Sequence, residues 1–263
     1  MRADKFFAGR FGSRTKAAEA IERGWVLVSG KAIKPKDEIR DGDEIIFVQT
    51  EESFVSNGGY KLSRGIKTFD FDCNDKVFVD IGASTGGFTD CLLQNGAALV
   101  YAVDVGESQL DERLKKDSRV VVMDDTNARY LKKTDFLEQI DCAVTDVSFI
   151  SLRLIFPAIG VIIKEDGEAL VLIKPQFECE KKHIGKSGIV HPSAHAEIVK
   201  KVLGFAEESG LYPCAIVNAP VRKGKNIEYI LRLKKQKREG VSFQKIIEEV
   251  RKFVRRNSEG ELT

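Results

Sequence analysis

The sequence predicts an α/β protein in two parts: a small α+β domain, followed by a Rossmann-like domain built on a mostly parallel, seven-stranded sheet. Two observations support this prediction. From residue 59 onward, apolar strand-like runs alternate with amphipathic helical stretches, which is typical of βαβ units around a parallel sheet. Residues 1–50 have a different order of helix, turn, strand, turn and strand. A chain of 263 residues is long enough for two such domains.

The first domain is expected over residues 1–50. Ser13 is suited to begin a helix, Gly24 to end it, and glycine-containing turns separate the strands that follow. The expected elements are a helix over Arg14–Arg23 and strands over Trp25–Ser29 and Glu44–Val48. The polar residues 51–58 are predicted to form a linker.

The second domain is expected over residues 59–240, and a basic amphipathic helix with a short tail over residues 241–263. Strands and helices alternate in the order that βαβ units require. The predicted strands are Val77–Asp80, Val100–Asp104, Val120–Met123, Cys142–Asp146, Ala169–Lys174, Ala215–Asn218 and Ile227–Leu233. The predicted helices are Gly87–Asn95, Ser108–Lys115, Leu152–Ile163 and Ala194–Glu208.

A glycine-rich loop follows the first predicted strand of this domain, where α/β proteins bind nucleotide-like ligands. Its spacing, Gly82-x-x-x-Gly86-Gly87, differs from the G-x-G-x-x-G of dinucleotide-binding domains. Asp80 stands at the strand end, and a carboxylate there would repel a pyrophosphate. The pattern therefore favours a ligand with a positive amino group, a sulfonium and no phosphate. S-adenosylmethionine fits that description better than a dinucleotide.

Acids at the ends of the next two strands complete the predicted cofactor site. Asp104 is placed to accept the two ribose hydroxyls, and Asp124 to receive the adenine amino group. The alternative is that the loop glycines only permit tight packing. The predicted cofactor-binding residues are Asp80, Gly82, Ala83, Ser84, Gly86, Gly87, Phe88, Asp104 and Asp124.

Four charged residues are candidates for catalysis. Asp146 and Lys174 close the fourth and fifth predicted strands, so their side chains should converge above the ligand crevice. Lys61 precedes the first of these strands, and Glu228 lies at the start of the last one. The alternative is that the four residues form two surface salt bridges.

Together with the glycine loop, these motifs resemble the FtsJ-like ribose methyltransferases, which have a Lys-Asp-Lys-Glu tetrad, and among them the TlyA, or hemolysin-A-like, branch. The resemblance covers nearly the whole chain, through Asp80–Thr89, Asp104–Gly106, Thr126–Arg129, Asp146–Leu152, Lys174–Glu178, Gly188–Val190 and Gly224–Tyr229. It implies a methyltransferase fold, S-adenosylmethionine as methyl donor, and 2′-O-methylation of cytidine in small-subunit ribosomal RNA. In longer family members it also implies large-subunit RNA, and the sequence leaves open whether one or both subunits are substrates.

The residue types suit this chemistry, because a ribose hydroxyl must lose its proton as it attacks the methyl carbon. Lys174 would either stabilise the developing alkoxide or act as the base, if desolvation and the nearby Lys61 lower its pKa. Asp146 and Glu228 would orient and partly neutralise the two lysines. Holding the oxygen, methyl carbon and sulfur in line would supply much of the rate.

Residues 1–50 resemble the small RNA-binding module named after the fourth small-subunit ribosomal protein, through the motifs Arg2-x-Asp4-Lys5-Phe6, Ser13-Arg14-x-x-Ala17 and Gly24-x-Val26-x-Val28-x-Gly30-Lys31. Basic residues gather here, with nine Lys or Arg against three acids between Met1 and Lys36. Such a block favours a polyanion partner, the alternative being a solvated basic face. The predicted RNA-binding residues are Arg2, Lys5, Arg14, Lys16 and Lys31.

The composition favours a cytoplasmic protein. Five dispersed cysteines form no C-x-x-C motif, which argues against a disulfide scaffold and a zinc knuckle. No secretory signal is expected, and the longest apolar run, Ile155–Ile163, is about half of a membrane span. No metal is expected either, since Pro192 between His191 and His195 suggests the start of a helix.

Two other classes of function compete with the methyltransferase. The hemolysin label of the family suggests a membrane-active cytolysin. The sequence does not support this class, because it contains no membrane span, secretory signal or strongly amphipathic lytic helix. An RNA-binding chaperone with a degenerate methyltransferase fold is the third class, and the intact charged tetrad argues against it. The predicted partners are ribosomal RNA and ribosomal subunits, and the oligomeric state stays open.

Overall fold

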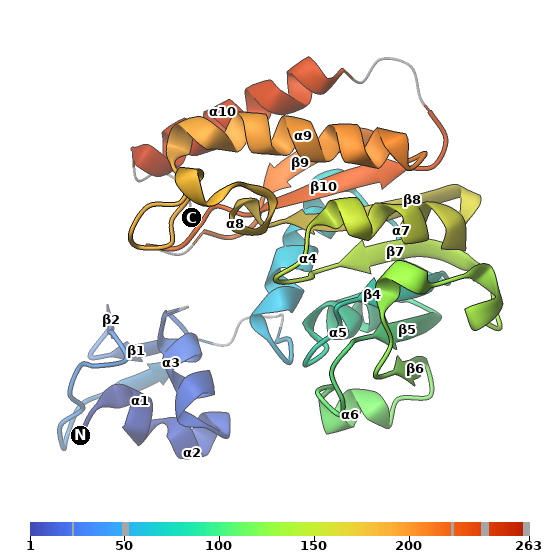
Figure 1. Ribbon diagram of the computed structural model, residues 1–263. Helices are drawn as coiled ribbons and strands as arrows, with labels where there is room; N and C mark the ends of the chain where they lie inside the picture. The colour runs from blue at the N-terminus through green and yellow to red at the C-terminus, as the bar shows by residue number, and fades with distance from the viewer. Residues whose placement is uncertain (23, 49–52, 222–223, 238–241, 260–263) are drawn as a thin grey trace. The chain divides into compact units, whose positions relative to one another are not determined.

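The computed structural model describes residues 1–22, 24–48, 53–221, 224–237 and 242–259, apart from the side chains of residues 16 and 19. The chain folds into two compact units, Met1–Ser53 and Phe54–Thr263, which are coloured from blue to red along the chain in Figure 1.

The first unit is a small α+β structure. Its elements are α1 (Ala3–Phe6), α2 (Ala8–Phe11), α3 (Arg14–Glu22), β1 (Val26–Val28), β2 (Lys31–Ala32) and β3 (Ile45–Phe47). The strands form an antiparallel sheet in the order β2-β1-β3. The helix after Ser13 and the strands β1 and β3 are as predicted, whereas β2 includes Lys31, which was expected in a turn. Helices α1 and α2 were not expected either, because helices of four residues show no periodic pattern. Its core consists of Ala3, Phe7, Ala17, Ile21, Val26 and Ile39.

In the described part of the second unit, seven strands form one sheet in the order β6-β5-β4-β7-β8-β10-β9. The strands are β4 (Val77–Ile81), β5 (Leu99–Val103), β6 (Val120–Met123), β7 (Ile140–Thr145), β8 (Ile163–Ile173), β9 (Tyr212–Asn218) and β10 (Tyr229–Lys234). The pairs from β6 to β8 are parallel, and β10 is antiparallel to both of its neighbours. The predicted mostly parallel, seven-stranded sheet is confirmed.

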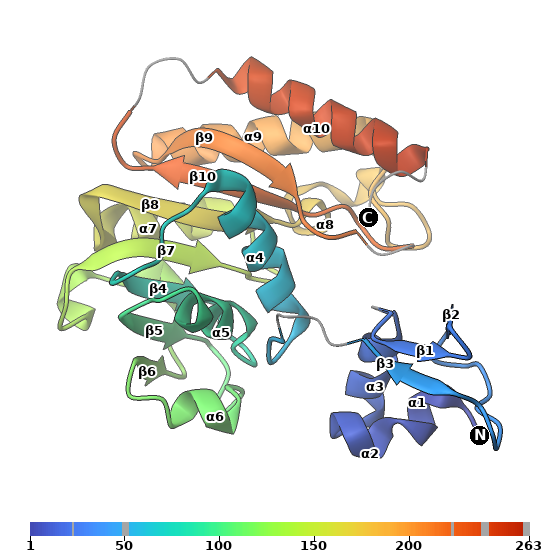
Figure 2. The same cartoon turned by 180° about the vertical axis from the view of Figure 1, so that it is seen from behind.

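Helices cover both faces of this sheet. They are α4 (Asn57–Phe69), α5 (Gly87–Gln94), α6 (Glu112–Lys115), α7 (Phe156–Ile162), α8 (Pro175–Glu178), α9 (His195–Glu208) and α10 (Phe243–Ser258). Figures 1 and 2 show α4 and α5 on one face and α7 and α9 on the other. Helix α10 packs against α9 and β9. Within the described ranges, the chain has no helix both long enough and apolar enough to cross a membrane.

Helix α4 is the main departure from the predicted elements, because the sequence predicts no helix over Asn57–Phe69 and places residues 57 and 58 in a linker. Its glycines indicate a turn in the sequence, but they are needed for close packing. A Cβ on Gly59 would lie 2.3 Å from Cγ of Phe54, and one on Gly65 would lie 2.8 Å from Cγ2 of Ile230. Phe54 is itself part of the core of the second unit, so residues 54–58 belong to this unit rather than to a linker.

The predicted helix Leu152–Ile163 is also shorter than expected. The chain forms a 3-10 turn over Leu152–Leu154 and then α7, and Ile163 already begins β8. The predicted helix Ser108–Lys115 contracts to α6, whose N-terminus is capped by the Asp111 side chain accepting from the Arg113 amide.

Candidate active site

Four charged side chains meet at one edge of the sheet in the second unit. Strands β7 and β8 are parallel, so Asp146 and Lys174, which directly follow them, lie at the same edge. Strand β10 is antiparallel to β8, and its first residue pairs with the last residue of β8. Glu228, one position earlier, therefore lies at this edge as well. Helix α4 adds Lys61. The fold therefore brings together all four residues that were singled out in the sequence as candidates for catalysis.

The four side chains alternate in charge along a connected chain. Nζ of Lys61 lies 2.7 Å from Oε2 of Glu228 and 3.9 Å from Oδ2 of Asp146. Nζ of Lys174 lies 2.5 Å from Oδ1 of Asp146. The side chains are only 10% to 23% exposed. Ion pairs this sheltered are screened far less than surface salt bridges, so the arrangement differs from two surface pairs.

Four further residues of this region had no role assigned from the sequence. The Lys174 ammonium donates to Oγ of Ser148 over 2.7 Å, and Nε2 of Gln176 donates to Oε1 of Glu228 over 3.4 Å. Phe149 is 91% exposed and has a φ of +63°, which is unusual for a bulky residue. Its ring packs against Phe177, with 4.9 Å between ring centroids.

The glycine loop lies at the carboxyl end of β4, next to this cluster. Gly82 and Gly86 have φ values of +81° and +92°, which side chains rarely adopt. A Cβ on Gly86 would lie 2.2 Å from Cδ1 of Leu114, and one on Gly87 would lie 2.2 Å from Oγ of Ser56. Tight packing therefore requires Gly86 and Gly87, whatever the loop binds.

Asp80 lies beneath this loop and is completely buried. Its Oδ2 accepts a hydrogen bond of 2.7 Å from the Thr89 hydroxyl, while Oδ1 has no hydrogen-bond partner among the described residues. Burial raises the pKa of Asp80 to about 7, the Thr89 hydroxyl opposes this, and the carboxylates of Asp146 and Asp104 add to it. A buried acid with one unsatisfied oxygen fits a ligand that brings a positive donor.

The acids after β5 and β6 organise the loops beside the glycine loop. Asp104 accepts from the amides of Ser84 and Gly106, each over 2.8 Å. Asp124 accepts from the amide of Ser108 over 2.9 Å. Both acids are partly exposed, so lone pairs on their carboxylates remain accessible to ligand hydroxyl or amino groups.

Two of the predicted cofactor-binding side chains are placed differently from the rest. Ala83 and Phe88 are 7% and 4% exposed and belong to the hydrophobic core. Only their backbone groups could therefore face a ligand.

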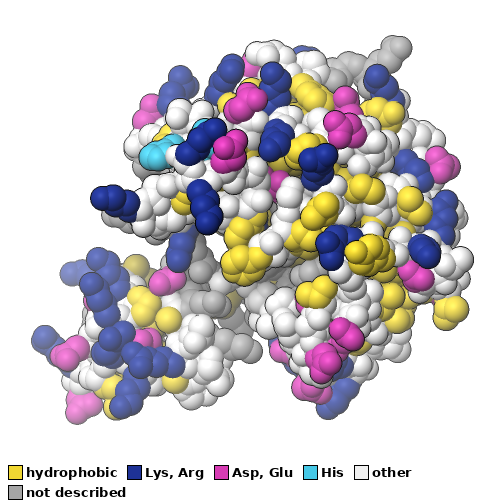
Figure 3. All heavy atoms as spheres, viewed as in Figure 1, with side chains coloured by type: hydrophobic (Ala, Val, Ile, Leu, Met, Phe, Trp, Pro, Cys, Tyr) yellow, Lys and Arg dark blue, Asp and Glu magenta, His cyan; other side chains and the backbone are white. Residues whose placement is uncertain are grey.

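The predicted RNA-binding residues belong to the first unit, where dark blue side chains cover much of the face seen in Figure 3. Arg2 and Arg14 lie together, beside the same carboxylate. Lys5 on α1 and Lys31 on β2 are exposed. The side chain of Lys16 lies outside the described part of the chain.

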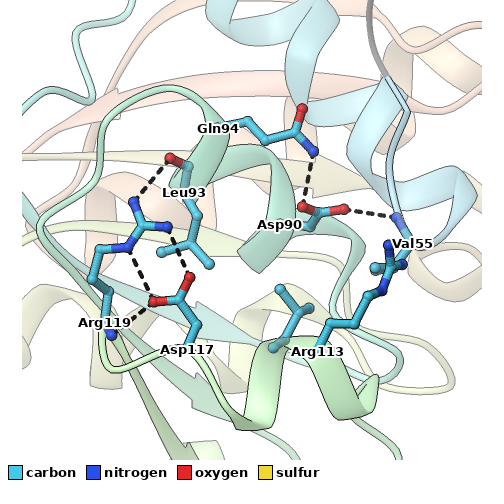
Figure 4. Close-up of a pocket in the computed structure, with 8 residues that line it drawn as sticks. Val55, Asp90, Leu93, Gln94, Arg113, Asp117 and Arg119 are labelled. Carbon is cyan, nitrogen blue, oxygen red and sulfur yellow. Dashed lines mark hydrogen bonds and ion pairs between the residues drawn. The ribbon is translucent and has the colours of Figure 1, made fainter.

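A pocket of about 280 Å³ lies away from the charged cluster, between α5, α6 and the segment before α4 (Figure 4). Asp117 pairs with Arg119, and Asp90 accepts from the Val55 amide and the Gln94 side chain. Arg113 pairs with Asp111, which lies outside the wall, so these polar groups already have partners within the protein. The lining residues are Val55, Asp90, Leu93, Gln94, Arg113, Leu114, Asp117 and Arg119.

Histidines do not form a metal site in the described part of the chain, where no group of three or more His, Cys, Asp or Glu is arranged to hold an ion. His195 is buried, and its Nδ1 lies 2.8 Å from the Tyr229 hydroxyl. Burial lowers the pKa of His195 to about 4, so this residue is a neutral partner within the core.

The strand order, the glycine loop after β4 and the charged cluster at the sheet edge define a Rossmann-like methyltransferase. Residues 54–235 match the model of the FtsJ-like methyltransferases. The chain belongs to this family.

Relatives resemble the chain over most of its length. It is 42% identical over 225 residues to the "Putative rRNA methyltransferase YqxC" of Bacillus subtilis, which covers 84% of this chain and 80% of the relative. It is 39% identical to the 16S/23S rRNA (cytidine-2'-O)-methyltransferase TlyA of Mycobacterium tuberculosis, over 85% of each chain. Among solved structures, a "Putative hemolysin from Streptococcus thermophilus" matches with a TM-score of 0.75 and 37% identity over 98% of both chains.

Proposed function

We propose that the protein transfers a methyl group from S-adenosylmethionine to the 2′-hydroxyl of a cytidine in ribosomal RNA. The observation that supports this most strongly is the alternating chain of Glu228, Lys61, Asp146 and Lys174 beside the glycine loop. The name of the Mycobacterium tuberculosis relative supports the substrate and the methylated atom.

The cofactor would lie across the carboxyl ends of β4, β5 and β6. Asp80 offers a carboxylate oxygen without a partner among the described residues, which suits the amino group of the methionine part. Asp104 would accept the ribose hydroxyls, and Asp124 the adenine amino group. When bound, the cofactor supplies an electrophilic methyl group.

Lys174 would act directly on the nucleophile. Its ammonium is fixed between Asp146 and Ser148, at 2.5 and 2.7 Å, so a substrate hydroxyl beside it meets a positive charge already in place. A preorganised charge stabilises the alkoxide that develops as the hydroxyl attacks, and the hydroxyl proton passes to solvent water. Lys61, itself paired with Glu228, would hold the second oxygen of Asp146 and thereby the orientation of Lys174.

Phe149 would position the target nucleotide. The residue follows Ser148 directly, its ring is almost fully exposed, and its backbone has the unfavourable φ of +63°. Strained backbone of this kind persists where the surrounding structure enforces it, often at ligand sites. An exposed aromatic ring beside the catalytic lysine is suited to stack on a nucleobase.

The first unit would supply RNA affinity rather than chemistry. Its exposed Arg and Lys side chains are suited to phosphate contacts, which position an RNA without reading much of its sequence.

The experiment that tests this proposal compares Lys174→Ala with Lys116→Ala, which removes an exposed lysine outside the site. Methyl transfer into purified ribosomal subunits should fall on the order of a hundredfold to a thousandfold in Lys174→Ala, while binding of S-adenosylmethionine is retained. Lys116→Ala should match the wild type. Full activity of Lys174→Ala would refute the assigned role, and lysis of cells by the purified protein would favour the cytolysin instead.

A further inference from the structure

The first unit contains a shielded carboxylate held between two arginines. Oδ1 of Asp4 accepts a hydrogen bond of 3.2 Å from Nε of Arg2, and Oδ2 accepts one of 2.9 Å from Nη2 of Arg2. The same Oδ2 accepts from Nε of Arg14 over 3.0 Å. The Asp4 side chain is 7% exposed, whereas those of Arg2 and Arg14 are 51% and 58% exposed.

The backbone fixes this carboxylate in place. The amide of Asp4 donates to the carbonyl of Pro35 over 3.0 Å, and the amide of Ala3 donates to the carbonyl of Asp37 over 2.8 Å. Ala3 itself is fully buried in the core of the unit. The hydrogen bond from Arg2 is the largest cause that holds the pKa of Asp4 below its usual value. The acid therefore stays ionised at neutral pH.

A shared carboxylate reduces both the repulsion between two neighbouring cations and the entropy that their side chains lose on binding. Two guanidinium groups at one place repel each other, and each flexible side chain loses rotamer entropy when a ligand orders it. An acid that both groups contact offsets the repulsion and orders them beforehand. The shared carboxylate contacts only one edge of each planar guanidinium group, so the remaining N–H groups of both arginines can face a phosphate.

We propose that Asp4 is a positioning residue for RNA, which holds Arg2 and Arg14 together as one phosphate-binding site. The inference rests on the proposed RNA-binding role of the first unit and assigns that role a specific pair of arginines. Asp4 acts only through them, because its own negative charge repels RNA.

Removal of Asp4 should change the RNA affinity in the direction opposite to that expected for an ordinary surface acid. Removing a negative charge from an RNA-binding protein ordinarily strengthens binding to the polyanion. If Asp4 orders the two arginines, its removal must instead weaken binding, even though the net charge of the protein becomes more positive. Asp41→Asn is the matched control, because it makes the same change at an exposed residue in a turn of the same unit.

The test measures binding of the full-length protein to a small-subunit ribosomal RNA transcript at several salt concentrations. We expect Asp4→Asn to lower the affinity about threefold to tenfold, and Asp41→Asn to leave it unchanged or raise it. In methyl transfer, Asp4→Asn should raise KM for the RNA and leave kcat unchanged. An affinity of Asp4→Asn at or above that of wild type would overturn the proposal.

A double-mutant cycle separates positioning from folding. Arg2→Ala/Arg14→Ala should weaken binding and reduce its salt dependence by one to two phosphate contacts, about one for each arginine. In that background, Asp4→Asn should cause no further loss. A further loss as large as in the wild-type background would mean that Asp4 only maintains the fold, which contradicts the proposal. If Arg2→Ala/Arg14→Ala binds like wild type, the arginine site is wrong, while methyl transfer by the second unit would stand untouched.

Discussion

Asp80→Asn should make the unliganded protein more stable while weakening its binding of S-adenosylmethionine. The substitution replaces a completely buried acid with a neutral side chain of the same shape. In the folded protein the pKa of Asp80 is about 7, against an ordinary value of 3.8. Ionising this group inside the protein therefore has a free-energy cost that the amide avoids.

The sign and size of the stability change follow from the two pKa values. Below pH 4 the carboxyl is protonated in both the folded and the unfolded chain, so it contributes no difference. Between pH 4 and 7 the unfolded chain loses this proton and the folded protein keeps it, so the free energy of unfolding falls as the pH rises. Above pH 7 the loss is complete and amounts to roughly 4 kcal/mol at most. Asp80→Asn should recover a large part of this loss at pH 8 and little at pH 4.

The affinity for the cofactor should depend on pH in the opposite direction from the stability. A positive amino group binds the ionised carboxylate, so the affinity of the wild type for S-adenosylmethionine should rise as the pH increases through about 7. Asp80→Asn should bind more weakly at pH 8, and its affinity should lack this increase.

Urea unfolding at pH 4 and pH 8 measures the first effect, and titration calorimetry at the same pH values measures the second. Asp125→Asn is the control, since it neutralises an exposed carboxylate and should change neither quantity appreciably. The reasoning is refuted if Asp80→Asn is less stable than wild type at pH 8, or if both proteins bind the cofactor equally.

Phe149→Ala should raise KM for the RNA about tenfold, the loss expected for one stacked base, whereas Phe149→Tyr should behave like wild type in the same assay. Gly86→Ala should destabilise the protein by about 2–4 kcal/mol, because the backbone is left-handed and the new methyl meets Leu114. Gly204→Ala, with no atom within 4 Å of the new methyl, should raise the free energy of unfolding by about 0.5–1 kcal/mol in a denaturant titration. Removal of residues 1–53 should weaken RNA binding in filter assays and leave cofactor binding intact; unchanged RNA affinity would contradict the division of roles between the units.

The sequence predicts the sheet and the charged cluster well, because both depend on simple geometry. Asp146 and Lys174 directly follow apolar strands, and parallel strands bring their carboxyl ends to one edge. Glu228 joins them only through the antiparallel pairing of β10 with β8, which no local pattern reveals.

Other features depend on contacts between distant residues and could not be predicted in this way. Helix α4 is hidden by its glycines, whose purpose is clear only when Phe54 and Ile230 lie against them. The role proposed for Phe149 depends on the left-handed backbone of its loop. Asp4 counts in the sequence as one acid in a basic segment, and only the fold places it between Arg2 and Arg14.

The position of the transferred methyl group tests the proposed function most directly. Ribosomal subunits are methylated with purified protein and labelled S-adenosylmethionine, and the RNA is then hydrolysed in alkali. Alkaline cleavage needs a free 2′-hydroxyl, so a 2′-O-methylated cytidine should leave the label in a dinucleotide that resists cleavage. If the label is released in a mononucleotide, the methyl group is on a base, and the roles proposed for Lys61, Asp146, Lys174 and Glu228 are wrong.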